Sequence, residues 1–329
     1  MQKNFLVGIA AGIVSFIAMM SATTGTPILQ FVMFLVAPLP LFLAGLALGW
    51  RAAAIGAITA GIAITLLAGP LVGFVSAGSQ FGPPVLLTYL ALLNREVASP
   101  GGNATATEWY PIGRLVLWCA VLGTLLSVIL LMMLGKDAVE VQENLSQILR
   151  QAFEQFRAQS GDKKPLSEED LETMTRVALS LLPAASGMLM TGILLINLYI
   201  AARVTDASGT LSRPWPDLAA LAYPPVTPLV LAASVVVSAV LSGFAGMTAA
   251  AASGAFYFAY VLLGLAIVHH ITRGNPGRFA ILWAVYFALF FLNTIASLVV
   301  AIIGLTEPFS PLRRNFMRPP PHRGPPGPD

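Results

Sequence analysis

Uncharged, mostly apolar stretches alternate with short charged segments along the whole chain. Each of these stretches exceeds the ~20 apolar residues that a helix needs to cross the hydrocarbon core of a bilayer. The pattern therefore predicts an all-α fold, a polytopic bundle of transmembrane helices. The stretches without Asp, Glu, Lys or Arg are 4–50, 52–94, 115–135, 177–202, 218–272 and 279–306.

The number of spans depends on how the stretch 52–94 folds. The first and fifth stretches are long enough for two spans each, and 115–135, 177–202 and 279–306 for one each. Within 52–94, the sequence "GPLVGFVSAGSQFGPP" at 69–84 is rich in residues that interrupt helices. Two crossings here give nine spans, and one crossing with a broken or re-entrant segment gives eight. We expect eight, because this arrangement places most Lys and Arg residues in the cytoplasm.

A polar insertion at 135–180 separates an N-terminal membrane region, 1–134, from a C-terminal one, 181–306. Its apolar residues fall on one helical stripe over 138–156 and on a second stripe after "GDKKP". We expect an amphipathic helical hairpin outside the membrane. Its stripes either pack on each other or on lipid headgroups, or form a docking surface for a partner protein. The Pro-rich tail 307–329 is expected to be disordered.

The composition agrees with a membrane protein and excludes a soluble globular domain. Hydrophobic residues make up 57% of the chain and charged residues 10%, with a mean hydropathy of +0.79. The net charge of +3 lies in the loops and the tail, where it favours anionic lipid headgroups over nucleic acid. We expect an integral protein of the bacterial cytoplasmic (inner) membrane. A single cysteine, Cys119, provides no disulfide framework.

The charge-free stretches carry none of the motifs of an enzyme. Metalloprotease, serine-hydrolase, P-loop and dinucleotide-binding patterns are missing from the sequence. We therefore expect no catalytic residues, no cofactor and no metal. The adjacent His269 and His270 point about 100° apart on a helix, unlike a chelating pair four residues apart. They are expected to lie at the membrane interface, with one of them a hydrogen-bond donor or proton acceptor in a cavity as the alternative.

Uncharged polar residues supply the candidates for a binding site. Interrupted helices in transporters expose backbone donors and acceptors to a cavity, so we expect a site at 69–94. The alternative is an ordinary kinked hairpin whose polar residues bond between helices. The ligand-binding candidates are Ser79, Gln80, Tyr89 and Asn94 in this segment, with Asn197 and Asn293 from later helices.

Small-residue pairs spaced by four positions indicate close packing between helices. These pairs are Gly8 with Gly12, Gly45 with Gly49, and Gly69 with Gly73.

Several stretches together resemble the YybS-like family of uncharacterised bacterial multi-span membrane proteins, a domain of unknown function. That family is similar, more remotely, to the substrate-binding S components of energy-coupling-factor transporters, which implies a helical bundle with a small-molecule pocket. The resemblance covers nearly the whole chain and brings no catalytic residues. The matching stretches are "LALGWRAA" (46–53), "FGPPVLLTYLALLNRE" (81–96), "WYPIGRLVLW" (109–118), "GLAIVHHITRG" (264–274) and "IIGLTEPFSPLRRN" (302–315).

Two functions follow as expectations. The first is a membrane protein that is not an enzyme and that binds or helps to move a small, largely apolar solute, as an S component does with a separate ATPase. The alternative is a scaffold or assembly factor that acts through the 137–180 hairpin without any solute. Besides membrane lipids, the expected partners are therefore the solute with an ATPase, or another protein.

Overall fold

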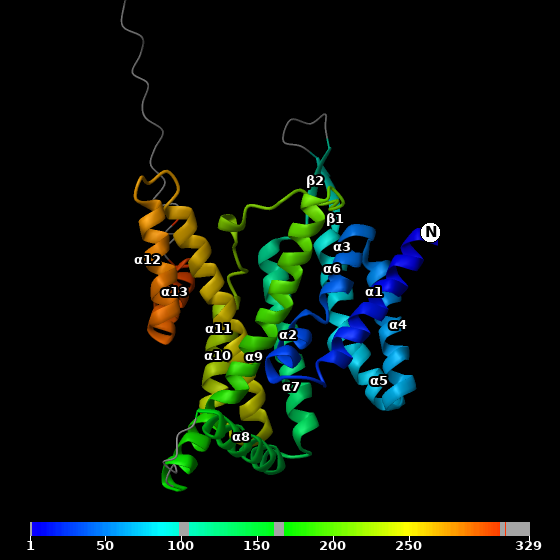
Figure 1. Ribbon diagram of the computed structural model, residues 1–329. Coiled ribbons are helices and arrows are strands. Elements are labelled where there is room, and N and C mark those ends of the chain that lie inside the picture. The colour runs from blue at the N-terminus through cyan, green and yellow to red at the C-terminus, as the bar shows by residue number, and fades with distance from the viewer. Residues whose placement is uncertain (1, 99–104, 161–167, 310–312, 314–329) are drawn as a thin grey trace, which may run out of the picture. The chain divides into compact units, whose positions relative to one another are not determined.

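The computed structural model describes residues 2–98, 105–160, 168–309 and 313. The tail predicted to be disordered lies outside these residues, apart from 307–309 and Arg313. Two compact units divide the chain: unit 1 comprises 1–216 and 229–258, and unit 2 comprises 217–228 and 259–329. Figure 1 labels the elements, and helix α11 contributes residues to both units.

Helices account for most of the described residues, as the sequence predicts. They are α1 Gln2–Ser21, α2 Pro27–Val36, α3 Leu39–Leu48, α4 Trp50–Ala68, α5 Pro70–Ser76, a π-helical turn Ala77–Phe81, α6 Gly82–Leu92, α7 Ile112–Leu134, α8 Ala138–Ser160, α9 Glu168–Ala207, a 3-10 turn Leu218–Ala220, α10 Thr227–Val240, α11 Gly243–Ile271, α12 Arg278–Phe291 and α13 Asn293–Thr306.

Six helical segments of the described chain are long and apolar enough to cross a membrane. The fold is therefore polytopic and all-α in character, and the count of eight or nine spans stays a prediction. These segments are Asn4–Ser21, Pro27–Leu48, Trp50–Ala68, Ile112–Leu134, Glu172–Ala207 and Gly243–Ile271, and the shorter apolar helices are Thr227–Val240, Arg278–Phe291 and Asn293–Thr306.

In the segment 69–84, expected to be broken or re-entrant, α4 ends before Gly69, which has a φ of 93°, and the chain is helical from Pro70 onward. Helices α5 and α6 are joined by the π-helical turn, so that Pro70–Leu92 forms one uninterrupted run. Pro83 and Pro84 cannot donate to the carbonyls four residues earlier, and a π turn changes the bonding pattern where those donors are missing. The segment thus contains a helix end at Gly69 and, at 77–81, a local widening of the helix that follows.

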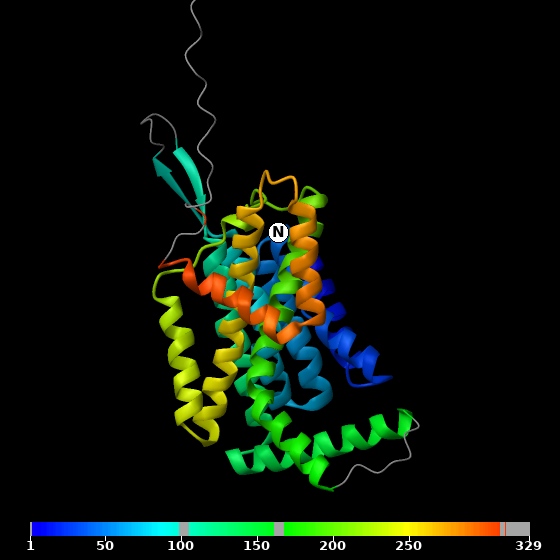
Figure 2. The same ribbon diagram turned by 90° about the vertical axis from the view of Figure 1, so that its left-hand side faces the viewer.

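The stretch 279–306, predicted to hold a single span, forms two helices. Helices α12 and α13 have 14 residues each and meet at Leu292, where the chain bends (Figure 2). A helix of this length extends about 21 Å, less than the ~30 Å of a bilayer core. Neither helix can therefore cross a membrane unaided.

The structure contains a short β-hairpin that the sequence did not predict. Strand β1, Asn94–Ala98, pairs antiparallel with β2, Thr105–Trp109, and Asn94 lies opposite Trp109. Arg95 and Glu108 form an ion pair of 2.7 Å on its surface.

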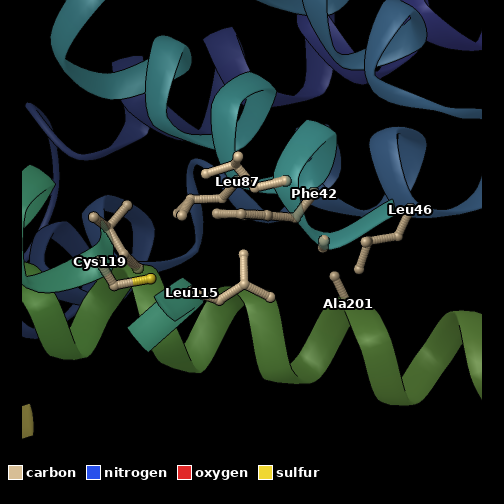
Figure 3. Close-up of a cluster of buried hydrophobic side chains, with 9 residues drawn as sticks. Phe42, Leu46, Leu87, Leu115, Cys119 and Ala201 are labelled. Atoms are coloured by element: carbon tan, nitrogen blue, oxygen red, sulfur yellow. The ribbon is translucent and has the colours of Figure 1, made fainter. Parts of the chain in front are cut away.

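The core of unit 1 forms where α3, α6, α7 and α9 meet. Figure 3 shows Phe42, Leu46, Leu87, Leu115 and Cys119 turned toward one another, with Ala201 beneath them. All six are buried. These helices carry apolar residues around most of their circumference, which lets one face fill the core while the others remain available to lipid.

Glycines set the distance between α1 and α4. A Cβ atom on Gly8 would lie 2.8 Å from the Ala52 carbonyl oxygen, and one on Gly12 would overlap the Gly56 backbone. The close packing predicted from this pair is confirmed. In the other two pairs, Gly45 and Gly73 make close approaches, whereas Gly49 and Gly69 have positive φ angles and end helices.

The predicted hairpin at 135–180 contains the helix α8 and the start of α9. The second helix does not end at 180: α9 runs for 40 residues from Glu168 into the membrane region, with Pro183 inside it. The boundary expected between 180 and 181 thus falls within one helix. Both views show α8 lying across the ends of α7 and α9 (Figures 1 and 2).

Candidate functional site

The six predicted ligand-binding residues lie on several elements, and their surroundings differ. Asn293 belongs to unit 2 and the other five to unit 1. Asn94 is exposed in the β-hairpin, where its side-chain amide bonds the Leu92 carbonyl. Tyr89 is 42% exposed and packs edge-on against Trp50. Both side chains are therefore exposed at the surface of unit 1.

Three further candidates, Ser79, Gln80 and Asn293, each have different surroundings. The Ser79 hydroxyl bonds back to the Val75 carbonyl of its own helix, 2.7 Å away. Gln80 is half-buried in the π-helical turn, and Asn293 is exposed at the first position of α13. None of these positions provides a set of converging polar groups.

Asn197 joins two helices of unit 1. Its side-chain amide donates to the Leu35 carbonyl at 2.7 Å and to the Ile193 carbonyl at 2.8 Å, and the residue is 1% exposed. Leu35 lies in the last turn of α2, just before Pro38 and Pro40 interrupt the chain. Asn197 thus satisfies a carbonyl at a helix end, the interhelical role that was the alternative to ligand binding.

Replacement of Asn197 by leucine is expected to lower the free energy of unfolding by about 1–2 kcal/mol, since it leaves the Leu35 carbonyl without its donor. Thermal unfolding in detergent measures the effect. Asn94→Leu is the control, because its side chain is exposed and a surface change of this kind alters stability by about 0.5 kcal/mol or less. Equal stability of the two variants would refute the structural role of Asn197.

A different group of polar residues converges in unit 2, beside a segment without α-helix. Residues 217–226 precede α10 and contain only the 3-10 turn. Asp217 pairs with Arg273, just beyond the end of α11, and the Tyr223 hydroxyl donates to the Ala259 carbonyl at 2.7 Å. Ala259 precedes the end of α11 by twelve residues, or about 18 Å. The non-helical segment therefore runs beside α11 over about 18 Å of the length of that helix.

Helix α13 reaches the same part of unit 2. Cβ atoms on Gly264 and Gly304 would overlap or touch the carbonyl oxygens of Val300 and Tyr260, respectively. Figure 2 shows α13 crossing α11. The two glycines let the helix backbones touch, which brings Glu307, at the end of α13, close to this crossing.

Glu307 and Arg313 complete a ring of contacts around the crossing of α11 and α13. This polar ring of unit 2 consists of Asp217, Tyr223, Tyr260, Arg273, Glu307 and Arg313. Arg313 Nε lies 3.5 Å from Glu307 Oε1, and its Nη2 donates to the Leu221 carbonyl of the non-helical segment at 2.5 Å. Tyr223 packs edge-on against Tyr260, with ring centroids 5.6 Å apart. The side chains of Arg313 and Glu307 are only 13% and 19% exposed.

Three residues of this ring, Tyr260, Glu307 and Arg313, have a buried side-chain atom without a hydrogen-bond partner. In the part of the chain that the structure describes, six buried side-chain atoms have no hydrogen-bond partner, and four of them belong to unit 2. Such atoms cost free energy unless water or a ligand bonds them. The four are Tyr260 Oη, His270 Nδ1, Glu307 Oε2 and Arg313 Nε.

Charge interactions join the ring to the end of α11. The Arg273 guanidinium, through its hydrogen bonds, lowers the pKa of Asp217, and Arg273 lies on the surface with it. Burial lowers the pKa of Arg313, whereas Glu307 and Asp217 oppose that change. This region thus contains two cations, Arg273 and Arg313, and two carboxylates, Asp217 and Glu307, in balance.

The side chains of His269 and His270 point in different directions. His269 Nε2 lies 2.9 Å from the Tyr286 hydroxyl of α12, and His270 turns its Nδ1 into a buried position. Both side chains are half-buried. The cavity-facing alternative stays a prediction for both residues. Among the described residues, no group of three or more His, Cys, Asp or Glu side chains could hold a metal ion.

Comparisons with known proteins give a family and no function. A family model described as a predicted membrane protein, DUF2232, matches residues 13–307. No curated protein and no solved structure matches the chain. The match covers far more than half of the sequence and agrees with the helices long enough to span a bilayer. The chain therefore belongs to the DUF2232 family of predicted membrane proteins.

Proposed function

We propose that this protein is a non-enzymatic membrane component that binds a small solute at the polar ring of unit 2. The observation that supports the proposal is the group of unpaired buried atoms on Tyr260, Glu307 and Arg313 beside the non-helical segment 217–226. Helices that are interrupted within the membrane form the solute sites of many transporters, where backbone that is not helical lines a cavity. The site proposed from the sequence, at 69–94, has no comparable group.

The unpaired atoms specify the polar part of the solute. Arg313 Nε requires an acceptor and Glu307 Oε2 requires a donor, whereas the Tyr260 hydroxyl serves as either. The neighbouring Leu221, Tyr223 and Pro224 are largely apolar. The solute is then a small, largely apolar molecule with one polar group that both donates and accepts hydrogen bonds. The resemblance to S components supports the same function, with a separate ATPase as partner and the bacterial inner membrane as the location.

Tyr260→Phe is expected to abolish retention of a copurifying small molecule without lowering thermal stability. The change removes a hydroxyl that has no protein partner, so no hydrogen bond of the fold is lost. Native mass spectrometry of the protein purified in mild detergent detects the bound mass, and thermal unfolding checks the fold.

Tyr89→Phe is the matched control, because it makes the same change within the segment 69–94. Loss of the bound molecule in Tyr89→Phe, with retention in Tyr260→Phe, would move the site back to that segment. A wild-type protein that carries another protein and no small molecule would instead favour the scaffold function.

A further inference from the structure

The apolar face of helix α8 is covered by other helices in the first half of the helix and partly exposed in the second half. In the first half, Val141 and Leu145 are buried among residues of α7, α9 and the first turns of α11, all within unit 1. In the second half, Ile148 is 50% exposed and Ala152 is exposed, while Leu149 and Phe153 are half-buried. The covered half therefore fixes the direction in which the uncovered half points.

That direction is toward the membrane. The neighbours of Val141 and Leu145 are Leu131, Leu134, Leu179, Leu182, Phe244 and Met247. They belong to helices α7, α9 and α11, which are each long and apolar enough to cross a bilayer. Helix α8 lies across the ends of α7 and α9 in both views (Figures 1 and 2). The apolar face of α8 is therefore directed along the axes of these helices, toward the membrane that they can cross.

We infer that the second half of α8 lies in the bilayer interface, with its apolar face in contact with lipid acyl chains. The polar face bears Glu140, Glu143, Arg150 and Glu154 on the opposite side, as an interfacial helix requires. Since these four charges sum to −2, burial of apolar surface, and not attraction to anionic lipid, holds the helix in place.

The junction of α7 and α8 has the mixed character of the headgroup boundary. Asn144 donates to the Leu134 carbonyl at the end of α7, with a distance of 2.6 Å. A groove of about 280 Å³ lies there. Polar amides and apolar side chains share its lining, which matches a lipid at the level where its headgroup meets its chains. The lining residues are Met133, Leu134, Asn144, Gln147, Ile148 and Gln151.

Site-directed nitroxide labels on the full chain in phosphatidylcholine and phosphatidylglycerol vesicles test this placement. Labels are attached to Ile148→Cys and Ala152→Cys, each in a Cys119→Ser background, and their collisions with oxygen and with a neutral nickel chelate are compared. Oxygen concentrates in the acyl region and the chelate in water. Both labels are expected to favour oxygen.

Glu143→Cys and Glu154→Cys are the matched controls on the polar face, and their labels are expected to favour the nickel chelate. Equal access of the chelate to all four positions would place α8 in water and overturn the inference. Low access of both reagents at 148 and 152 would show that protein, from a partner or a second copy, covers the face, and would overturn it as well. Chain folding is checked for each variant by thermal unfolding, so that only folded protein is compared.

Discussion

Substitution of Gly187 by alanine is expected to destabilise the protein by about 1–3 kcal/mol, the cost of overpacking a tight contact. A Cβ atom on Gly187 of α9 would overlap the Ala251 carbonyl oxygen of α11, and one on Gly254 of α11 would overlap the Ala184 carbonyl oxygen of α9. The contact is therefore reciprocal and involves backbone on both sides, so neither helix can relieve it by a side-chain rotation. Thermal unfolding in detergent measures the loss.

Gly192→Ala tests the same change on the same helix. A Cβ atom there would lie 3.6 Å from the Phe258 ring, an ordinary contact. The gain in helix propensity of about 1 kcal/mol is common to both variants, so Gly192→Ala should be neutral or stabilising. If Gly187→Ala proved as stable as Gly192→Ala, the two helices would not be in backbone contact.

Replacement of Arg313 by methionine should destabilise unit 2 by about 3 kcal/mol, because it leaves the charge of Glu307 buried without its counter-ion. The two side chains are 13% and 19% exposed, and Arg313 also donates to the Leu221 carbonyl. Unfolding of the purified protein, followed by intrinsic fluorescence against temperature, measures the change.

The double variant Arg313→Met with Glu307→Gln separates charge from packing. Removing both charges avoids the isolated carboxylate, so the double variant should be more stable than Arg313→Met alone by about 1–2 kcal/mol. Additive losses in the two single variants and the double variant would show that the two groups do not interact across 3.5 Å.

The sequence revealed where helices occur better than how they end. Charge-free stretches located the six helices that are long and apolar enough to cross a membrane, because the absence of charge is what a bilayer requires of them. The π-helical turn at 77–81 and the bend at Leu292 were missed. Both lie within apolar sequence, where the pattern of charges contains no boundary. The β-hairpin was missed because its strands are short and polar and follow a helix without a break.

The candidate site could not be found from the sequence for a related reason. Asp217, Glu307 and Arg313 flank charge-free stretches, so each was assigned to a loop or to the tail. Their convergence depends on the Gly264 and Gly304 crossing and on the non-helical segment, and these contacts join positions far apart in the chain. The polar residues within spans were easier to notice, but Asn197 proved to bond between helices.

The length of α9 has a mechanical consequence. Its 40 residues measure about 60 Å, twice the thickness of a bilayer core. Pro183 deprives the Leu179 carbonyl of its usual donor, which makes this the point of least bending stiffness. The 15 residues before it act as a lever arm of about 22 Å, so a change of 20° at the proline would swing the start of α9 by roughly 8 Å. A thinner or thicker membrane that tilts the span would thereby produce an amplified displacement at its far end.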